Sequence, residues 1–270
     1  CPGQACIGFS MASERFMRDN PAAALQALLR ALPGYGARLI FPRQDSEASQ
    51  LAALEGPESE SRLHSITTSV AIKGNFESYW STRHSEVRRT VRRSEKKLVD
   101  SGLTPRLRTL ESPGDMADGI AEHGRLETAG WKGHEGTAIA ANNRQGKMYV
   151  DLMTRFASNH DAVIYQLLLD DRVVASLLSV VHGNIQAMLK TTYDESYSAL
   201  GIGRYINYLM YRDVFDRSPG RTIENYTSST KIDRRWCTHH REIIDLDYVP
   251  LASFRALRAF KHRFKRRGEH

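Results

Sequence analysis

The clearest pattern of apolar positions lies in the second half of the chain. Three runs rich in aliphatic residues cover 162–169, 173–181 and 185–193, and short polar turns at 170–171 and 182–184 separate them. Tight polar turns between such runs are typical of antiparallel strands. The pattern therefore predicts a three-stranded antiparallel meander.

A second pattern, of helical period, begins at residue 76. Its apolar members fall within roughly a 60° arc of a helical wheel and are Phe76, Trp80, Val87, Val91 and Leu98. They predict one long amphipathic helix that ends at Ser101-Gly102, because glycine is the usual residue after a helix C-cap. The other side of this helix is basic, with Arg88, Arg89, Arg92, Arg93, Lys96 and Lys97. Such a face is typical of a solvated surface, and it also suits contact with phosphate.

Weaker patterns predict further elements before the meander. We expect a helix over 21–32 and a short strand over 37–41. The acidic stretch that follows, from Asp45 to Glu60, predicts a second helix and then a loop. One more helix is expected within 109–130, and another over 144–159 with Met148, Leu152 and Phe156 on its buried face.

After the meander the pattern alternates between helix and strand. A helix is expected over 201–216, strands over 222–226 and 242–248, and a basic helix over 251–265. Between the helices at 109–130 and 144–159, the glycines at positions 133 and 136 predict a loop.

Composition limits the class of protein. Lysine and arginine outnumber aspartate and glutamate by 38 to 31, so the surface favours anionic partners. The cysteines, Cys1, Cys6 and Cys237, form no CxxC pair, which favours neither a zinc site nor a disulfide framework and predicts a cytoplasmic protein without a metal. No apolar run approaches the roughly 18 residues of a membrane span. The first residue is Cys, so we expect a processed or truncated N-terminus.

The loop after the meander has the composition of a phosphate site. It reads Ala199-Leu200-Gly201-Ile202-Gly203-Arg204 and leads into the predicted helix at 201–216. Backbone N–H groups and the dipole converge at a helix start, glycine lets an anion approach the backbone closely, and arginine adds a charged contact. Two glycines before a helix are also a common turn. A Rossmann motif is not indicated, because it needs a third glycine and a parallel strand.

Several short motifs together resemble one family. They are Trp131-Lys132 followed by residues 136–139, the run Lys190-Thr191-Thr192-Tyr193-Asp194-Glu195, the glycine loop, and Trp236 after Lys231. The combination, over about residues 76 to 248, resembles the FemAB-related branch of the GNAT superfamily, and within it the acetyltransferase domain of CelD proteins of cellulose or exopolysaccharide biosynthesis. That family usually has Ser-Pro-Gly where this chain has Ala199-Leu200-Gly201.

The resemblance implies an α+β GNAT fold, with a central mixed, mostly antiparallel sheet flanked by helices. It also implies two GNAT-like halves in tandem, of which residues 1–70 would be the C-terminal remnant of the first and 71–270 the second. The strand at 222–226 would splay from the meander, and the pantetheine of acyl-CoA would lie in the opening.

The chemistry implied is direct attack of an amine on an acyl thioester, with acyl-CoA, such as acetyl-CoA, as co-substrate. Candidate bases are Asp194, Glu195 and Glu224, and Tyr193 is a candidate proton donor to the leaving thiolate. The acceptor would contact four residues, namely Trp131, Lys132, Lys190 and Lys231. Each of these side chains is also compatible with a plain surface or packing role. A nucleophilic role for Cys237 is not indicated, because its histidine neighbours in sequence need not be neighbours in space.

Three functions are compatible with these features. The first is an N-acyltransferase acting on a small amine or amino sugar, in exopolysaccharide or cellulose biosynthesis. The second is a FemAB-like transferase that uses aminoacyl-tRNA, with the basic helix faces on RNA phosphates. The third is a GNAT-fold binding module without catalysis, suggested by the basic run at 255–267.

Overall fold

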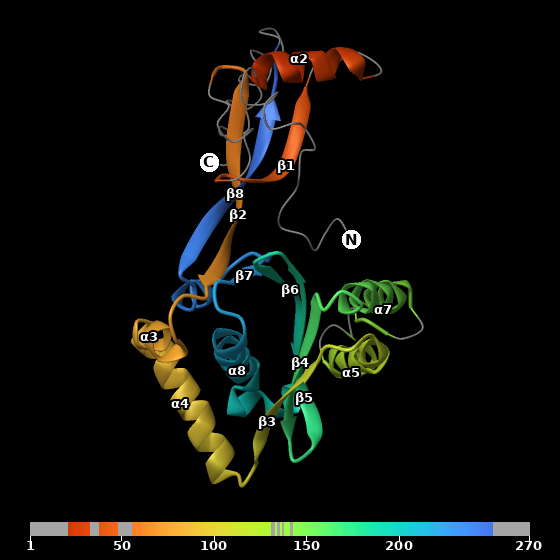
Figure 1. Ribbon diagram of the computed structural model, residues 1–270. Coiled ribbons are helices and arrows are strands. Elements are labelled where there is room, and N and C mark those ends of the chain that lie inside the picture. The colour runs from red at the N-terminus through yellow and green to blue at the C-terminus, as the bar shows by residue number, and fades with distance from the viewer. Residues whose placement is uncertain are drawn as a thin grey trace, which may run out of the picture. The chain divides into compact units, whose positions relative to one another are not determined.

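The computed structural model describes residues 21–32, 38–47, 56–130, 133, 136, 138–140 and 143–250 (Figure 1). By their contacts the residues divide into two compact units. Unit 1 comprises Cys1–Thr67, Tyr226–Ser229 and His240–His270, and unit 2 comprises Thr68–Asn225 and Thr230–His239. The origin of residues 1–70 as the end of a first GNAT-like half stays a prediction. The expected helix at 251–265 lies outside the described residues.

Unit 1 is a small sheet covered by one helix. Helix α2 (Pro21–Ala31) accompanies strands in the order β1 (Leu39–Asp45), β8 (His239–Tyr248) and β2 (Ser59–Ala71). The first two pair antiparallel, and an apolar cluster forms around Leu25, Leu29, Leu39, Leu246 and Tyr248. The expected helix at 21–32 and the strand expected at 242–248 are confirmed. The strand expected at 37–41 begins at Leu39.

Unit 2 holds the main sheet. Starting from the end of β2, its strand order is β7 (Thr222–Asn225), β6 (Ile185–Tyr193), β5 (Arg172–His182), β4 (Ala162–Leu169) and β3 (Pro105–Leu110). All neighbours run antiparallel except β6 and β7, which are parallel. The predicted meander is therefore confirmed as β4, β5 and β6, within the expected mixed and mostly antiparallel sheet.

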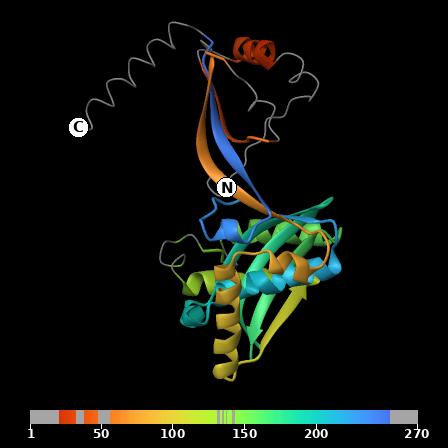
Figure 2. The ribbon, with the colours of Figure 1, turned by 90° about the vertical axis from the view of Figure 1, so that its left-hand side faces the viewer.

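Helices cover both faces of this sheet (Figures 1 and 2). Helices α5 (Met116–Ala129) and α7 (Arg144–Ala157) lie on one face, and their core includes Met116, Ile120 and Met153. The other face carries α3 (Phe76–Ser81), α4 (Ser85–Asp100) and α8 (Ile202–Arg217) over a larger core. No helix in these described ranges has the length and apolar character that crossing a membrane requires.

Aromatic side chains of α3 pack against those of α8. The Phe76 and Phe215 rings meet edge to face at 5.8 Å, and the Tyr79 and Phe215 rings stack at 4.8 Å. The Tyr79 hydroxyl donates to the carbonyl of Trp236 at 2.6 Å, and burial raises the pKa of that hydroxyl well above its usual value. Aromatic pairs of this kind stabilise beyond the area that they bury. The cluster therefore makes α3 part of the core of unit 2.

The single long helix expected from residue 76 is wrong, because the chain breaks it into α3 and α4. Helix α3 ends at Ser81, with the Thr82 hydroxyl donating to the carbonyl of Tyr79. Helix α4 begins anew, with the His84 ring accepting from the Glu86 amide. These local caps satisfy backbone groups that a continuous helix would bond internally. The expected end of α4 is confirmed, since Ser101 is the C-cap and Gly102 has a φ of +67°.

Strand β2 was not predicted, because the acidic composition up to Glu60 indicated a helix and then a loop, and no element was expected over the residues that follow. Its first six residues are largely exposed, and only the stretch from Ser65 onward is mostly buried, so the alternation typical of a half-buried strand is missing. The buried face predicted for α7 is correct in part, because Leu152 and Phe156 are partly buried and pack against the core. Tyr149, Met153 and Ala157 are buried, whereas Met148 is 40% exposed.

Two adjacent residues of α4 test how strongly this helix is held. Leu98 is fully buried and Val99 is 75% exposed. We expect Leu98→Ala to lower the free energy of unfolding by about 2–5 kcal/mol because it leaves a cavity. Val99→Ala should change it by less than about 0.5 kcal/mol. Urea unfolding monitored by circular dichroism measures both, and equal effects would contradict the packing described here.

Candidate functional site

Strand β6 extends past the end of its neighbour β7. It pairs with β5 along its whole length, but with β7 only from Ile185 to Met188. The register with β5 shifts between Leu178 and Ser179, which leaves Leu189 as the extra residue of a bulge on β6. No strand among the described residues pairs with 189–193 on the side of β7. The two parallel strands therefore separate where the motif at 190–195 begins.

Two glycines shape the turn that follows this edge. Gly201 ends the 3-10 helix η3 (Glu195–Leu200), precedes α8, and has a φ of +73°. A Cβ there would lie 2.6 Å from the Ser94 hydroxyl, and one on Gly203 would lie 3.0 Å from the Tyr193 ring. The amides of Ile202 and Gly203, the first two of α8, have no acceptor within the part of the chain that the structure describes. Close approach and free N–H groups are the features that bind a phosphate.

A cavity of about 400 Å³ opens at this helix start. Three segments line it, namely the end of α5, the end of β6, and the turn into α8, through Leu126, Glu127, Gly130, Thr191, Thr192, Tyr193, Glu195, Ser198, Gly201, Ile202, Gly203 and Arg204. The cavity thus joins the glycine loop to the motif at 190–195.

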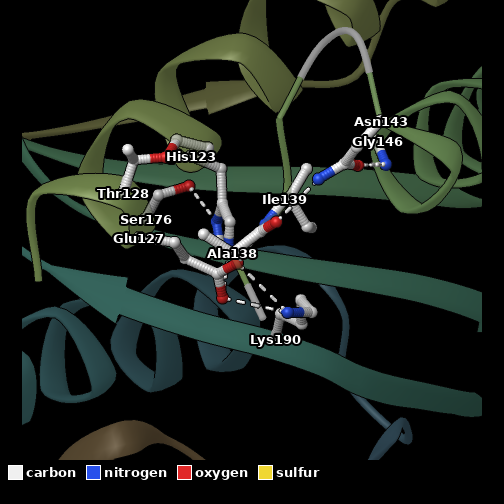
Figure 3. Close-up of polar contacts among 10 residues, drawn as sticks. His123, Glu127, Thr128, Ala138, Ile139, Asn143, Gly146, Ser176 and Lys190 are labelled. Atoms are coloured by element: carbon white, nitrogen blue, oxygen red, sulfur yellow. Dashed lines mark hydrogen bonds and ion pairs between the residues drawn. The ribbon is translucent and has the colours of Figure 1, made fainter. Parts of the chain in front are cut away.

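A buried ion pair lies at the α5 side of the cavity (Figure 3). The Lys190 ammonium is 3.0 and 3.1 Å from the two carboxylate oxygens of Glu127, and these side chains are 7% and 0% exposed. The amide of Ile139 donates to the same carboxylate at 2.9 Å. Bidentate contact and an added N–H donor offset the cost of removing both charges from water. The pair therefore ties α5 to β6 and to the segment at 139.

His123 extends this network into the core. Its Nε2 is 3.5 Å from the Glu127 carboxylate, and its Nδ1 is 3.0 Å from the hydroxyl of Ser176 on β5 (Figure 3). Sequence reasoning missed both His123 and Glu127. Their spacing of four residues on a predicted helix puts them on one face, and this was the available signal. The pairing with Lys190 had no signal in the sequence.

Asp194 acts as a local cap. Its carboxylate accepts from the Ser196 hydroxyl at 2.6 Å and from the Ser196 amide at 3.0 Å, and Arg172 contacts it at 2.9 Å. The Ser196 hydroxyl bond, more than any other cause, holds the pKa of Asp194 below its usual value, and burial opposes this shift. A low pKa makes a carboxylate a weaker base. Asp194 is not among the residues that line the cavity.

The other predicted site residues are distributed unevenly. The cavity lining includes Tyr193, Glu195 and residues 201–204, but it does not include Ala199 and Leu200 of η3. Glu224 is buried on β7 opposite Ala187, which is roughly 20 Å along β6 from Tyr193 at 3.3 Å per residue. Lys231 is exposed and outside the lining. Trp131 and Lys132 lie outside the described residues.

The described part of the chain contains no candidate metal-binding site. No group of three or more His, Cys, Asp or Glu side chains in those ranges is arranged to hold an ion.

Comparison with known proteins bears on the family. The protein-family model described as an acetyltransferase (GNAT) domain matches residues 85–229, more than half of the chain. No curated protein sequence matches the chain. The family match begins at the first residue of α4 and includes all of the cavity-lining segments.

Solved structures share the fold. The crystal structure of FemX is 10% identical, covers 93% of this chain and 81% of its own, and has a TM-score of 0.58. The C-terminal DUF2156 domain of an Agrobacterium fabrum protein assigned as a lysylphosphatidylglycerol synthetase is 11% identical, with coverages of 92% and 77% and a TM-score of 0.56. L-PGS from Bacillus licheniformis is 11% identical, with coverages of 86% and 74% and a TM-score of 0.52. Identities this low establish similarity of fold alone.

Breaking the buried ion pair should be costly. Glu127→Ala leaves the Lys190 ammonium without this carboxylate, and we expect it to lower the free energy of unfolding by about 3–5 kcal/mol. The matched control is Glu122→Ala, which removes the exposed partner of Arg125 on the same helix and should cost less than about 1 kcal/mol. The double variant E127M/K190M should recover most of the loss. Urea unfolding measures all three, and similar effects for Glu127→Ala and Glu122→Ala would count against the pair.

The Asp194 cap should give a pH-dependent contribution. The pKa of Asp194 is lower in the folded state, so its stabilisation is present at neutral pH and is lost as pH falls through that pKa. We expect Asp194→Ala to cost about 0.5–2 kcal/mol near neutral pH. The difference from the parent should shrink below about pH 4. Unfolding free energies across this range test it, and a difference that grows in acid would be the contrary result.

Proposed function

The chain belongs to the GNAT acetyltransferase domain family, and on that premise we propose that it transfers an acyl group from acyl-CoA to an amine at the cavity beside α8. One observation carries the proposal. The free amides of Ile202 and Gly203 at the start of α8 lie at the same cavity as the end of β6, which continues past β7. A diphosphate and an extended pantetheine chain need these two features side by side.

The residues at the loop fit a diphosphate. The Ile202 and Gly203 amides supply two donors at the positive end of a helix of 16 residues, and Arg204 adds a cation to the cavity lining. At Gly203 a side chain would reach the Tyr193 ring, and at Gly201 it would reach Ser94, so glycine keeps the backbone accessible. The leucine at position 200, in place of the family proline, lies in η3 and outside the lining.

Bound acyl-CoA would supply an activated acyl group. The amine nitrogen forms a bond to the thioester carbonyl carbon, the carbon–sulfur bond breaks, and the amine gives up a proton as the thiolate leaves. Glu195 lines the cavity and is our first choice for accepting the proton, and Glu127 is a second carboxylate in the lining. Tyr193, whose side chain is partly exposed beside Gly203, is our choice for protonating the thiolate.

The acceptor is proposed at a coarser level. The cavity lining offers carboxylates for an amine and polar groups from Thr191, Thr192 and Ser198, which suits a small amine or an amino sugar. A role in exopolysaccharide or cellulose biosynthesis follows only from the resemblance to CelD proteins.

Aminoacyl-tRNA is the second candidate donor. Two observations favour it, namely the fold shared with FemX over 93% of this chain and with L-PGS over 86%, and the exposed basic side of α4. In this version the same cavity would receive an aminoacyl ester, and RNA phosphates would contact the basic residues.

Binding of acetyl-CoA separates these donors. We expect isothermal titration to detect acetyl-CoA binding to the parent protein at millimolar concentration or below. Gly203→Asp should weaken binding at least about tenfold more than Gly203→Asn. The aspartate and asparagine side chains have similar size and would contact Tyr193 in the same way. Only aspartate puts a negative charge where the diphosphate would bind. A negative charge at the start of a helix stabilises the helix, so weaker binding by Gly203→Asp would not result from loss of α8.

The comparison of the two variants also controls for folding, because their far-ultraviolet circular dichroism should match the parent. Absence of acetyl-CoA binding to the parent, together with salt-sensitive binding of tRNA, would replace the first proposal by the second. Equal binding by Gly203→Asp and Gly203→Asn would remove the loop from the site.

A further inference from the structure

A cation sits directly on the glycine loop, outside the cavity lining. The Lys97 ammonium, near the end of α4, donates to the carbonyl oxygen of Ala199 at 2.6 Å. An ammonium has three donors. Lys97 is exposed, and no other acceptor of its ammonium occurs among the described residues. Two of its N–H groups are thus available to a ligand on the loop.

Helix α4 presents more than one group to this loop. The Ser94 hydroxyl lies against Gly201, and Ser94 and Lys97 are three residues apart, so they share the face that contacts the loop. Arg93 lies one helical turn before Lys97 and is exposed. A second cation therefore borders the first on the same side of the helix.

Three other arginines of unit 2 have carboxylate partners. Arg172 pairs with Asp194, Arg217 with Glu111 and Asp213, and Arg235 with Glu86. In the described ranges, by contrast, no carboxylate forms an ion pair with Arg93, Lys97 or Arg204. Like charges gathered without counter-charges repel one another and attract an anion.

We propose that Lys97, with Arg93 beside it, forms a second phosphate subsite for the 3′-phosphate on the ribose of CoA. The inference rests on the proposed function, which puts the 5′-diphosphate of CoA on the α8 amides. That diphosphate and the 3′-phosphate belong to one ribose, so the second phosphate lies one sugar away. Lys97 contacts the loop carbonyl three residues before Ile202, and it is within reach of that position.

The subsite has a measurable consequence, which is discrimination between CoA and dephospho-CoA. Dephospho-CoA lacks only the 3′-phosphate and keeps the diphosphate and the pantetheine. A charged contact to that phosphate should make the parent protein bind CoA about tenfold more tightly, and the preference should weaken as salt is raised. The difference in affinity between CoA and dephospho-CoA thus measures the contact of Lys97 with the 3′-phosphate and not the contacts in the cavity.

Isothermal titration of both ligands against the full chain tests the subsite. In Lys97→Met, we expect most of the preference for CoA to be lost, whereas the affinity for dephospho-CoA should change by less than about twofold. Arg93→Gln should reduce the preference in part. The matched control is Arg89→Gln, which removes an exposed cation from the same helix about 12 Å farther from the loop and should leave the preference intact.

The outcomes are distinguishable. Equal affinities for CoA and dephospho-CoA in the parent would overturn the subsite and leave the proposed function standing. An equal loss for both ligands in Lys97→Met would also overturn it, since Lys97 would then act only by holding the Ala199 carbonyl. If neither ligand bound the parent, the proposed function would fail together with the subsite.

Discussion

Backbone hydrogen bonds hold β6 to β5 along its whole length, but they hold it to β7 along four residues only. Strand β7 ends early, so β6 continues past it from Leu189 to Tyr193. The chain then turns through η3 into α8, whose first amides face the same space. The end of β6 that extends past β7 and the start of α8 thus line the same cavity.

The part of the cavity lining that α5 contributes depends on a buried charge pair. Glu127 and Lys190 hold the end of α5 against β6, and the Ile139 amide joins them to the next segment. An apolar contact of similar volume would pack these elements with less desolvation. The ion pair instead fixes the orientation of the Glu127 carboxylate at the edge of a polar cavity. An apolar contact is not directional and would not fix the orientation of a side chain in this way.

The sequence indicated the fold where burial is uniform. Strands β4 and β5 are buried on both faces, so their apolar runs are nearly continuous and their polar turns stand out. The prediction failed for β2, because pairing with neighbouring strands and not apolar alternation determines its structure. It also failed for α3 and α4, because the caps at Thr82 and His84 interrupt a regular helical pattern. At the site, the glycines at 201 and 203 were visible in the sequence. The contact of Lys190 with Glu127 was not, because it joins residues 63 positions apart.

The aromatic cluster on α3 has a consequence for where this domain begins. The family match starts at Ser85, yet Phe76 and Tyr79 lie before it and pack against Phe215 within the core of unit 2. Proteins that share only the matched region must cover α8 with some other segment. The region matched by the family model is thus shorter than the segment that forms the hydrophobic core of unit 2. A fragment cut at Ser85 would begin inside its own hydrophobic core.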